Sequence, residues 1–513
     1  MTTKHRFSPS GIEPLEARIA PAAVVFTDLN GDHVKFTSSS TTPLSVITSA
    51  SGDGLHEKFA VDLSAAAFAG TSFSVSVTKG PHGDGVADIA INAGTNNLGA
   101  VTVAADLELI TAGSGSSTVP AIKSLTVNSM GRFEGIDGAL QTSVVNGSVG
   151  ALTVKGNVDG TNFKANAGIG SVSIGGSLLG GSNGQAYDGY IQANGNIGKV
   201  SIAGDVRGGS GDYSGRITSN GTLGPVTVGG SIYGGDGTFS GAIIDPTTIA
   251  VAGSVYGGSN QYSGSIYSFD ALGKVTVGGS VVGGSGELSG IIGAGTNVAS
   301  VVVVGSVHGG SGNGSGTIFG GGSDTGTIGK VSVGGSVVGG SGQFSGLLGA
   351  YEAEGSVSLT TVVIGKDIVG GTGAASGGVL AANGAIGSLT LKGSLVGGAS
   401  AGGESGFIES DLHAGSFSIA GSLYGGSLGE SGALDLAGGI SSLKIGGSLY
   451  GAAGNASASI NSSGTIGLLD IHGDVLGGSG TNSGGVTASG ITTEIIGGLV
   501  LPGTGTGSGT VTS

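Results

Sequence analysis

The 513-residue chain contains no cysteine and no tryptophan, and only 10% of its residues are charged. Without cysteine there are no disulfides and no thiolate chemistry. The net charge is −15 and only 18 residues are Lys or Arg, so no basic stripe is available to neutralise phosphates. No apolar run reaches the roughly 18 residues of a membrane span. These absences predict a chain that binds no nucleic acid and has no transmembrane segment.

Glycine is abundant, with 115 residues, but it does not recur at every third position as a collagen triple helix requires. Hydrophobic residues make up 38% of the chain, and the low charge is the reverse of the composition of disordered proteins. The composition therefore predicts a chain that buries a core.

A six-residue element, G-[SD]-[VIL]-x-G-G, recurs along most of the chain, and its second residue serves as an anchor for alignment. Successive anchors are 23 to 31 residues apart, a period typical of solenoids, propellers and repeat arrays. Weaker copies place Asp106, Met130 and Asn157 at the anchor and bring the number of copies to fifteen. The clear anchors are Ser177, Asp205, Ser231, Ser254, Ser280, Ser306, Ser336, Asp367, Ser394, Ser422, Ser448 and Asp474.

Each copy has apolar residues five and three positions before the anchor and one after it, for example Val226, Val228 and Ile232. This alternation of β-branched residues predicts short strands, and the GG, SG and NG pairs between them predict tight corners. The period is too short for a four-stranded propeller blade. Stacked coils would pair their strands in parallel and bury one continuous apolar column. We therefore predict an all-β fold, a parallel β-helix (β-solenoid) of about 15 coils.

Four segments are predicted: an export segment 1–22, an N-terminal β-rich cap 23–85, the solenoid repeats 86–500, and a disordered Gly/Thr-rich tail 501–513. Within the cap, Val24–Phe36 reads as a hairpin around Asn30-Gly31, and Asp62–Gly70 as one short capped helix. The cap is expected because the open parallel edge of a solenoid invites aggregation.

Two groups of residues are candidate binding sites. Asp28, Asn30 and Asp32 offer the oxygen ligands that Ca²⁺ prefers, although a turn between strands explains the same letters. The position two after the anchor is expected to point outward and includes Tyr233, Tyr256, His308, Tyr424 and Tyr450, a candidate docking stripe. The alternative is a bend that buries this position as well. A further aromatic column, Tyr213, Phe239, Tyr262 and Phe344, is interpreted as core stacking.

Parallel β-helices often carry polysaccharide lyases and hydrolases, which need clustered carboxylates or basic residues beside bound Ca²⁺. Acids are scattered through these repeats, so the prediction is a protein that is not an enzyme and has no cofactor apart from Ca²⁺ at the hairpin turn. A polysaccharide-active site in a divergent coil, such as those between Ser306 and Asp367, is the alternative. Ice binding by a flat face of small residues is a minor alternative, because a regular Thr-x-Thr array is missing.

The stretch SGIEPLEARIAPA, Ser10 to Ala22, resembles the LEPR-type N-terminal signature of large secreted or surface proteins of Gram-negative bacteria, departing from it at Ala17, where Pro is usual. The repeats resemble filamentous adhesins and the passengers of autotransporters. These resemblances imply an extracellular or outer-surface bacterial protein that acts as a structural rod or adhesin. The partners they imply are cell-surface glycans, other envelope or matrix proteins, or further copies of the chain.

Overall fold

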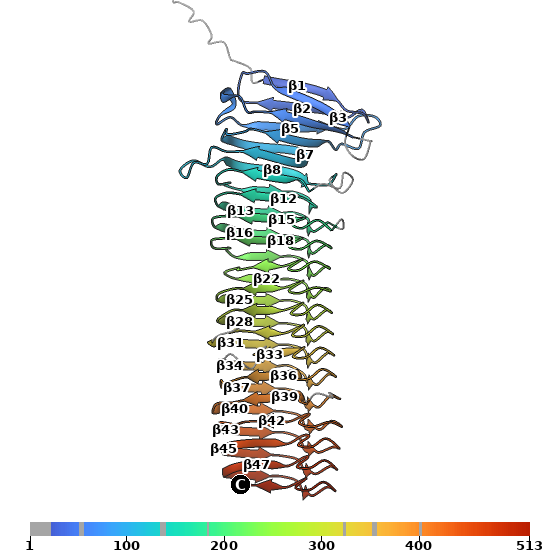
Figure 1. Ribbon diagram of the computed structural model, residues 1–513, viewed down its shortest axis with the longest axis vertical. Coiled ribbons are helices and arrows are strands. Elements are labelled where there is room, and N and C mark those ends of the chain that lie inside the picture. Colours follow the sequence, from blue (N-terminus) through green and yellow to red (C-terminus); the bar gives the residue numbers. More distant parts are fainter. Residues whose placement is uncertain are drawn as a thin grey trace, which may run out of the picture.

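The computed structural model describes residues 22–50, 56–133, 140–181, 184–321, 325–350, 356–399 and 403–513. They form a long rod of stacked coils with a wider cap at its amino end and the carboxyl terminus at the opposite tip (Figure 1). The predicted all-β parallel solenoid is confirmed, with about 17 turns instead of 15. No helix of the described residues is long and apolar enough to cross a membrane. The predicted signature at Ser10–Ala22 lies almost wholly outside the described residues.

Most coils contribute one strand to each of three parallel sheets, which we call sheets A, B and C. Sheet A holds the strand that precedes the anchor, and its register aligns equivalent residues, such as Val275 with Val301. Its strands are β8 (Ile122–Met130), β10 (Leu152–Val154), β13 (Ile169–Ile174), β16 (Ile197–Ile202), β19 (Val226–Val228), β22 (Ile249–Val251), β25 (Leu272–Val277), β28 (Val298–Val303), β31 (Thr325–Val333), β34 (Ser356–Ile364), β37 (Ile386–Leu391), β40 (Ala414–Ile419) and β43 (Ile440–Ile445).

Sheet B holds the two residues after the anchor, the first facing the core and the second facing outward, as Ile232 and Tyr233 do. Its strands are β11 (Val158–Asp159), β14 (Leu178–Leu179), β17 (Val206–Arg207), β20 (Ile232–Tyr233), β23 (Val255–Tyr256), β26 (Val281–Val282), β29 (Val307–His308), β32 (Val337–Val338), β35 (Ile368–Val369), β38 (Leu395–Val396), β41 (Leu423–Tyr424), β44 (Leu449–Tyr450), β46 (Val475–Leu476) and β48 (Val500–Leu501).

Sheet C follows the loop that contains the SG pair. Its strands are β9 (Thr142–Val145), β12 (Asn162–Ala165), β15 (Tyr190–Ala193), β18 (Arg216–Ser219), β21 (Ile243–Ile244), β24 (Ile266–Ser268), β27 (Ile292–Ala294), β30 (Ile318–Phe319), β33 (Leu347–Gly349), β36 (Ser376–Ala381), β39 (Ser405–Ser410), β42 (Leu434–Asp435) and β49 (Val511–Thr512). Strand β45 (Ile460–Ile471) pairs with β42 of sheet C and β43 of sheet A, and β47 (Val486–Ile496) pairs along most of β45 and with β49 of sheet C.

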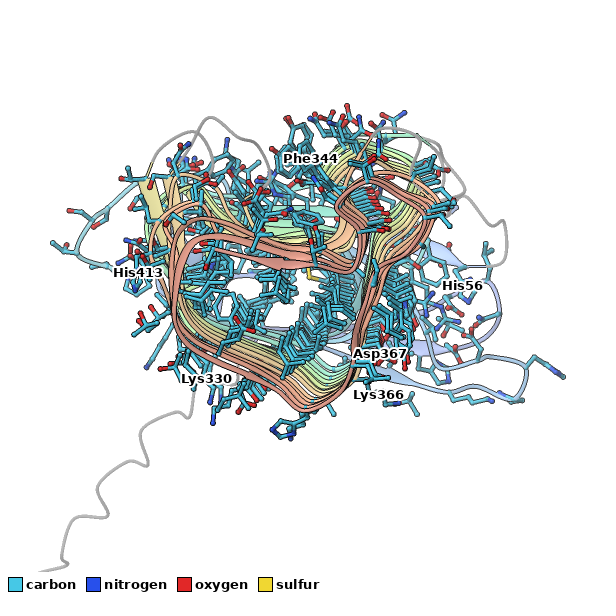
Figure 2. The ribbon with its side chains drawn as sticks, turned by 90° about the horizontal axis from the view of Figure 1, so that it is seen from below. His56, Lys330, Phe344, Lys366, Asp367 and His413 are labelled. Carbon is cyan, nitrogen blue, oxygen red and sulfur yellow. The ribbon has the colours of Figure 1, made fainter. Side chains whose placement is uncertain are left out.

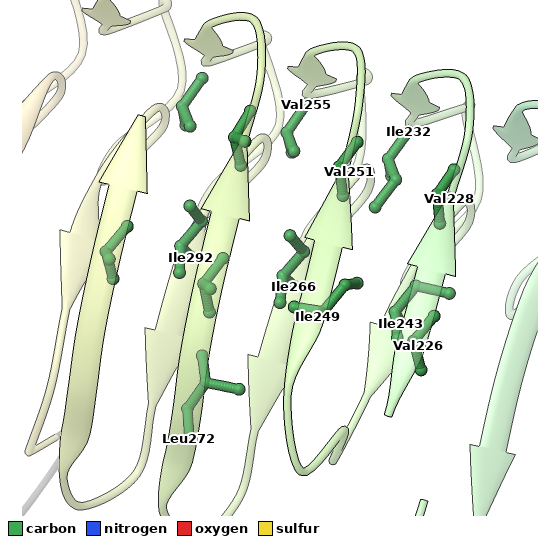
Figure 3. Close-up of a cluster of buried hydrophobic side chains, with 14 of the residues drawn as sticks. Val226, Val228, Ile232, Ile243, Ile249, Val251, Val255, Ile266, Leu272 and Ile292 are labelled. Atoms are coloured by element: carbon green, nitrogen blue, oxygen red, sulfur yellow. The ribbon is translucent and has the colours of Figure 1, made fainter. Parts of the chain in front are cut away.

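The core is a set of parallel columns of Val, Ile and Leu (Figure 3). Val226, Val228 and Ile232, the three apolar positions expected from one repeat, are at most 2% exposed. Because parallel pairing places the same position of each coil above the last, Ile266 of sheet C stacks directly against Ile292. Full burial of such a side chain stabilises the fold by about 1.5–3 kcal/mol, so the columns account for the rigidity of the rod.

The anchors form a hydrogen-bonded ladder between coils. The backbone N–H of Ser231 donates to Oδ1 of Asp205 (2.8 Å), and that of Ser254 donates to Oγ of Ser231 (3.0 Å). The same contact recurs as far as Asp474, whose N–H donates to Oγ of Ser448 (2.9 Å). Ser and Asp both carry a short side-chain oxygen that accepts this bond, which explains why the anchor alternates between them.

The serine of the SG pair that lies closest to sheet C closes the loop between sheets B and C. Ser315 is fully buried; its Oγ accepts from Gly310 N (3.0 Å) and donates to Gly312 O (2.7 Å). Equivalent bonds are made by Ser240, Ser345 and Ser483, among others. The sequence analysis treated this serine as part of a corner and missed that it holds the loop together.

Replacing Ser315 by alanine is expected to lower the free energy of unfolding by about 1–3 kcal/mol, because the Gly310 N–H loses its acceptor and the Gly312 carbonyl loses one of its two donors. Thermal unfolding of the full chain and hydrogen exchange at residues 308–318 measure this effect. Ser311→Ala is the matched control, since Ser311 is exposed in the same loop. Equal exchange in the two variants would show that the Ser315 hydroxyl does not hold the loop.

The cap begins with the expected hairpin, in which β1 (Ala22–Thr27) pairs antiparallel with β2 (His33–Ser38). β2 also pairs with β5 (Phe73–Thr78), and β3 (Ser45–Ala50) pairs with β4 (Glu57–Asp62). Parallel pairing starts already with β4 and β6 (Asp88–Asn92), and β5 and β6 both pair with β7 (Leu98–Ala112). This early start is one reason why the solenoid exceeds the expected number of turns.

Two expectations for the ends of the chain are wrong. The short capped helix is a single 3₁₀ turn, Ala66–Phe68, and no side chain caps it. Residues after Leu501 are not a disordered tail, because β49 pairs with β47 and Ser508 Oγ makes the two loop-closing bonds. A Gly/Thr/Ser-rich composition describes both a flexible tail and the corners of a coil, so composition alone misassigned this segment.

Candidate functional site

The structure places the predicted stripe on the outer side of sheet B. Tyr424 and Tyr450 are 42% and 38% exposed, and their rings stack with centroids 5.0 Å apart and an interplanar angle of 4°. Tyr233 and Tyr256 are half-buried and stack at 5.0 Å and 10°. His308 occupies the same column, half-buried, between Val282 and Val338. The position therefore points outward, and the predicted burial by a bend does not occur.

An arginine packs on the tyrosine pair nearer the amino end, Tyr233 and Tyr256. The Arg207 guanidinium lies 4.2 Å from the centroid of the Tyr233 ring and donates to Oδ2 of Asp205 (2.8 Å). This carboxylate also accepts from Ser231 N through its other oxygen, and together the hydrogen bonds and the charge of Arg207 lower the pKa of Asp205 despite its partial burial. The pair nearer the carboxyl end, Tyr424 and Tyr450, lies between Val396 and Leu476 in the column.

A second aromatic ladder lies on the loop before sheet C, where Tyr187, Tyr213, Phe239 and Tyr262 stack in successive coils. Their ring planes differ by 5–11° and their centroids are 4.6–6.0 Å apart. The interpretation as core stacking holds in part: Tyr213, Phe239 and Tyr262 stack, and Tyr262 and Phe344 pack against buried hydrophobic clusters, but all four side chains remain half-exposed at the loop. Phe344 of the same loop position lies at the outer edge of the coil, well away from the anchor Asp367 (Figure 2).

All four residues of this ladder adopt a left-handed backbone conformation, with φ between +52° and +69°. Such a conformation costs roughly 1–2 kcal/mol for a residue other than glycine. Elsewhere the same position holds Gly314, which avoids the cost. Leu288, Ala375, Glu430, Ala456 and Asn482 hold the same position in other coils with φ between +49° and +54°, so the left-handed residue is a general feature of this loop.

Beside this ladder is a hollow of about 620 Å³ over sheet C, within the roughly 300–1,000 Å³ range of small-molecule sites. Four coils contribute its walls: Tyr190; Arg216 and the turn Asn220–Thr222; Asp245 with Pro246 and Thr247; and Phe269 with Asp270 and Ala271. Gln192, Thr218, Ser219 and Ser268 complete the lining. The hollow combines hydrogen-bonding groups of both kinds with aromatic rings.

Arg216 is the most unusual residue of the hollow, because its side chain is only 8% exposed and makes no ion pair with any described residue. Its guanidinium lies 5.1 Å from the Tyr213 ring centroid and 5.2 Å from that of Phe239, and its Nε has no hydrogen-bond partner. Burial lowers the pKa of this guanidinium, but arginine remains charged at physiological pH.

Carboxylates gather elsewhere, near β39 and β42. Burial raises the pKa of Glu404 to about 7 and that of Glu409 to about 8, and Asp411, Glu430 and Asp435 add repulsion. Near the cap, burial likewise raises the pKa of Asp106 to about 6, although Ser129 Oγ and Arg132 N donate to it. In the sequence these acids look scattered. Coil stacking brings residues some 26 positions apart into proximity, so they gather only in the folded chain.

Asp28, Asn30 and Asp32 lie together in the hairpin turn. The Asp32 carboxylate is fully buried and accepts hydrogen bonds from the backbone N–H groups of Gly80, Asp84 and Gly85. Asp28 Oδ1 and Asn30 Oδ1 both accept from Asp32 N (2.8 and 3.2 Å). Among the described residues, no group of three His, Cys, Asp or Glu side chains is placed to hold a metal. These contacts favour the turn, and Ca²⁺ at this place stays a prediction.

Sequence reasoning missed Arg216, Asp245 and Phe269 as members of one site. One signal was available: Arg216 and Tyr190 stand at a sheet C position that holds Ala242 and Ser265 in the next coils. In the comparisons with known proteins, no family model, no curated protein and no solved structure matches this chain.

Proposed function

We propose that this chain is an exported, non-enzymatic β-solenoid of a bacterial cell surface or extracellular matrix, which serves as a rigid rod and binds polysaccharide along its length. The observation that carries the proposal is the pair of stacked, outward-facing tyrosines at two levels of the rod, Tyr233 with Tyr256 and Tyr424 with Tyr450. The exposed parts of these stacked rings, repeated at the coil spacing, offer an apolar strip to the C–H groups of successive sugars.

The fold supports the role of a rod. Most coils repeat the buried columns, the anchor ladder and the serine-closed loop, so rigidity is built from nearest-neighbour contacts along the axis. The N-terminal signature and the adhesin-like repeats support export and surface attachment by resemblance. Glycans of a cell surface or matrix are the partners that an exposed aromatic stripe favours.

A polysaccharide hydrolase is the second candidate, and one observation favours it. Glu404 and Glu409 have pKa values raised to about 7 and 8 by burial and by repulsion from neighbouring carboxylates, as a general acid requires. Both lie near a small cavity lined by Glu404, Phe407, Glu430 and Asp435. An enzyme of this kind would also need a carboxylate that stays ionised opposite the acid.

Retention on insoluble polysaccharides, with release of soluble sugar measured in the same samples, tests the proposal with the full chain. We expect retention without release, and a several-fold weaker retention for the double variant Tyr424→Ala/Tyr450→Ala. Val338→Ala is the matched control, since Val338 is in the same column but is not aromatic. The assay is run with Ca²⁺ and with EDTA, which also tests the hairpin-turn site.

Two outcomes would contradict the proposal. Sugar released by the wild-type chain and lost in Glu409→Gln would establish the hydrolase instead. Undiminished retention of the double tyrosine variant would show that the stripe is not the binding surface.

A further inference from the structure

We propose that the hollow over β15, β18, β21 and β24 is a subsite for one uncharged sugar residue, whose neighbouring hydroxyls bridge Arg216 and Asp245 while its ring packs on Phe269. The inference extends the proposed polysaccharide binding but depends on different residues, on a different sheet from the tyrosine stripe.

The first step is the buried cation. Arg216 has lost most of its contact with water, and its Nε–H has no acceptor among the described residues. The Nε atom itself is shielded from solvent, so a ligand oxygen reaches this guanidinium only through its terminal nitrogens, where a hydrogen bond to a charged and largely desolvated group is a strong one. The flanking rings of Tyr213 and Phe239 fix the guanidinium in place.

The second step concerns the hydrogen-bond acceptor of the hollow, Asp245. Asp245 has a left-handed backbone (φ +56°), and its Oδ1 accepts from Phe269 N (2.8 Å) and Ser268 Oγ (3.0 Å). These bonds fix the carboxylate through one oxygen and leave Oδ2 to accept from a ligand hydroxyl. Asp270 adds a second, exposed carboxylate at the rim.

The third step is the apolar surface. Phe269 is 57% exposed, and its ring meets the Tyr267 ring edge-on at 5.1 Å and the Phe239 ring at 6.5 Å. The phenyl ring is thus held by neighbouring aromatics while one part of it faces solvent. A sugar ring, with apolar C–H groups on one face and hydroxyls around its edge, matches an exposed aromatic ring beside polar groups.

Charge selects the class of sugar. The lining holds one cation, Arg216, and two carboxylates, Asp245 and Asp270, and the whole chain carries a net charge of −15. An acidic sugar is repelled by the two aspartates and by the net negative charge of the chain, and an amino sugar whose ammonium lies against Arg216 is repelled by the guanidinium. A neutral sugar avoids both penalties, because one hydroxyl accepts from Arg216 and its neighbour donates to Asp245.

Isothermal titration calorimetry of the full chain with neutral hexasaccharides (cellohexaose, xylohexaose, mannohexaose and maltohexaose), hexagalacturonate and chitosan hexamer tests the inference. We expect at least one neutral hexasaccharide to bind, and binding to weaken at least about tenfold, or about 1.4 kcal/mol, in Phe269→Ala and in Arg216→Gln. Thermal unfolding of both variants checks that the coils remain folded.

Asp245→Asn serves as the second variant, because the amide oxygen can still accept the bonds from Ser268 and Phe269 and the fold is kept. Removing one negative charge is expected to raise the affinity for hexagalacturonate relative to the neutral sugars. Tighter binding of hexagalacturonate or chitosan than of any neutral sugar by the wild type would overturn the inference, as would no binding at all. If Tyr424→Ala/Tyr450→Ala abolishes polysaccharide retention while the hollow variants bind normally, the proposed function stands and the hollow is not the subsite.

Discussion

Replacing Gly264 by valine is expected to lower the free energy of unfolding by about 3 kcal/mol or more. Gly264 is the glycine of an SG pair and has φ +63°, a conformation that β-branched residues avoid. A Cβ at this position would lie 1.9 Å from the backbone oxygen of Tyr256 and 2.7 Å from the amide nitrogen of Gly234. Both are backbone atoms of the loop-closing region, so neither can move without disturbing the adjacent coil.

One coil provides the matched control. Ala458 occupies the same repeat position with φ +50° and is fully buried, so a single methyl group is tolerated there at a cost. Ala458→Gly removes left-handed strain and is expected to stabilise the chain by up to about 1 kcal/mol.

Thermal unfolding and hydrogen exchange measure both changes, with faster exchange in Gly264→Val expected at residues 233–292. Equal stability of Gly264→Val and the wild type would show that the loop can relax around the side chain. The left-handed conformation of the loop would then not require glycine at this position.

Raising the pH from 5 to 9 is expected to lower the melting temperature by a few degrees, with the loss centred on the coils that contain β39 and β42. The pKa values of Glu404 and Glu409 are raised to about 7 and about 8 in the folded chain, above the ordinary value of 4.5. The folded state therefore binds these protons more tightly than the unfolded state. The resulting stabilisation is complete below about pH 4.5 and is lost as the pH rises through 7 and 8.

The physical cause is a group of acids that converge on one surface. Glu404, Glu409, Asp411, Glu430 and Asp435 come from neighbouring coils, and burial combined with mutual repulsion disfavours the charged form of the first two. No described lysine or arginine forms an ion pair with any of them.

The double variant Glu404→Gln/Glu409→Gln tests this cause, since it should flatten the fall in melting temperature between pH 5 and 9. Glu494→Gln, at an exposed position of β47, is the control and should leave the slope unchanged. Asp106, whose pKa is raised to about 6, contributes in the same direction and is present in all the variants. A slope that persists in the double variant would place the pH dependence elsewhere.

The fold could be predicted well because it follows from local rules repeated many times. Alternation at Val226, Val228 and Ile232 determines which side chains face the core, and a near-constant period determines that equivalent residues stack. The hydrogen bonds between successive anchors follow the same period. One error arose after Leu501, where the same composition fits a disordered tail and a further coil. The other arose at Ala66–Phe68, where a weak helix pattern forms only a single 3₁₀ turn.

The sequence by itself determined the parallel β-helix, its core columns and the outward stripe of Tyr233, Tyr256, Tyr424 and Tyr450, because these depend on alternation within one strand. Only the tertiary structure decided that Arg216, Asp245 and Phe269 share a hollow and that Glu404 and Glu409 share a charged surface. These residues are separated by loops in which a left-handed residue breaks the alternation, so their direction cannot be counted along the chain. Stacking then converts a separation of about one repeat period into direct proximity, and that proximity creates the candidate site.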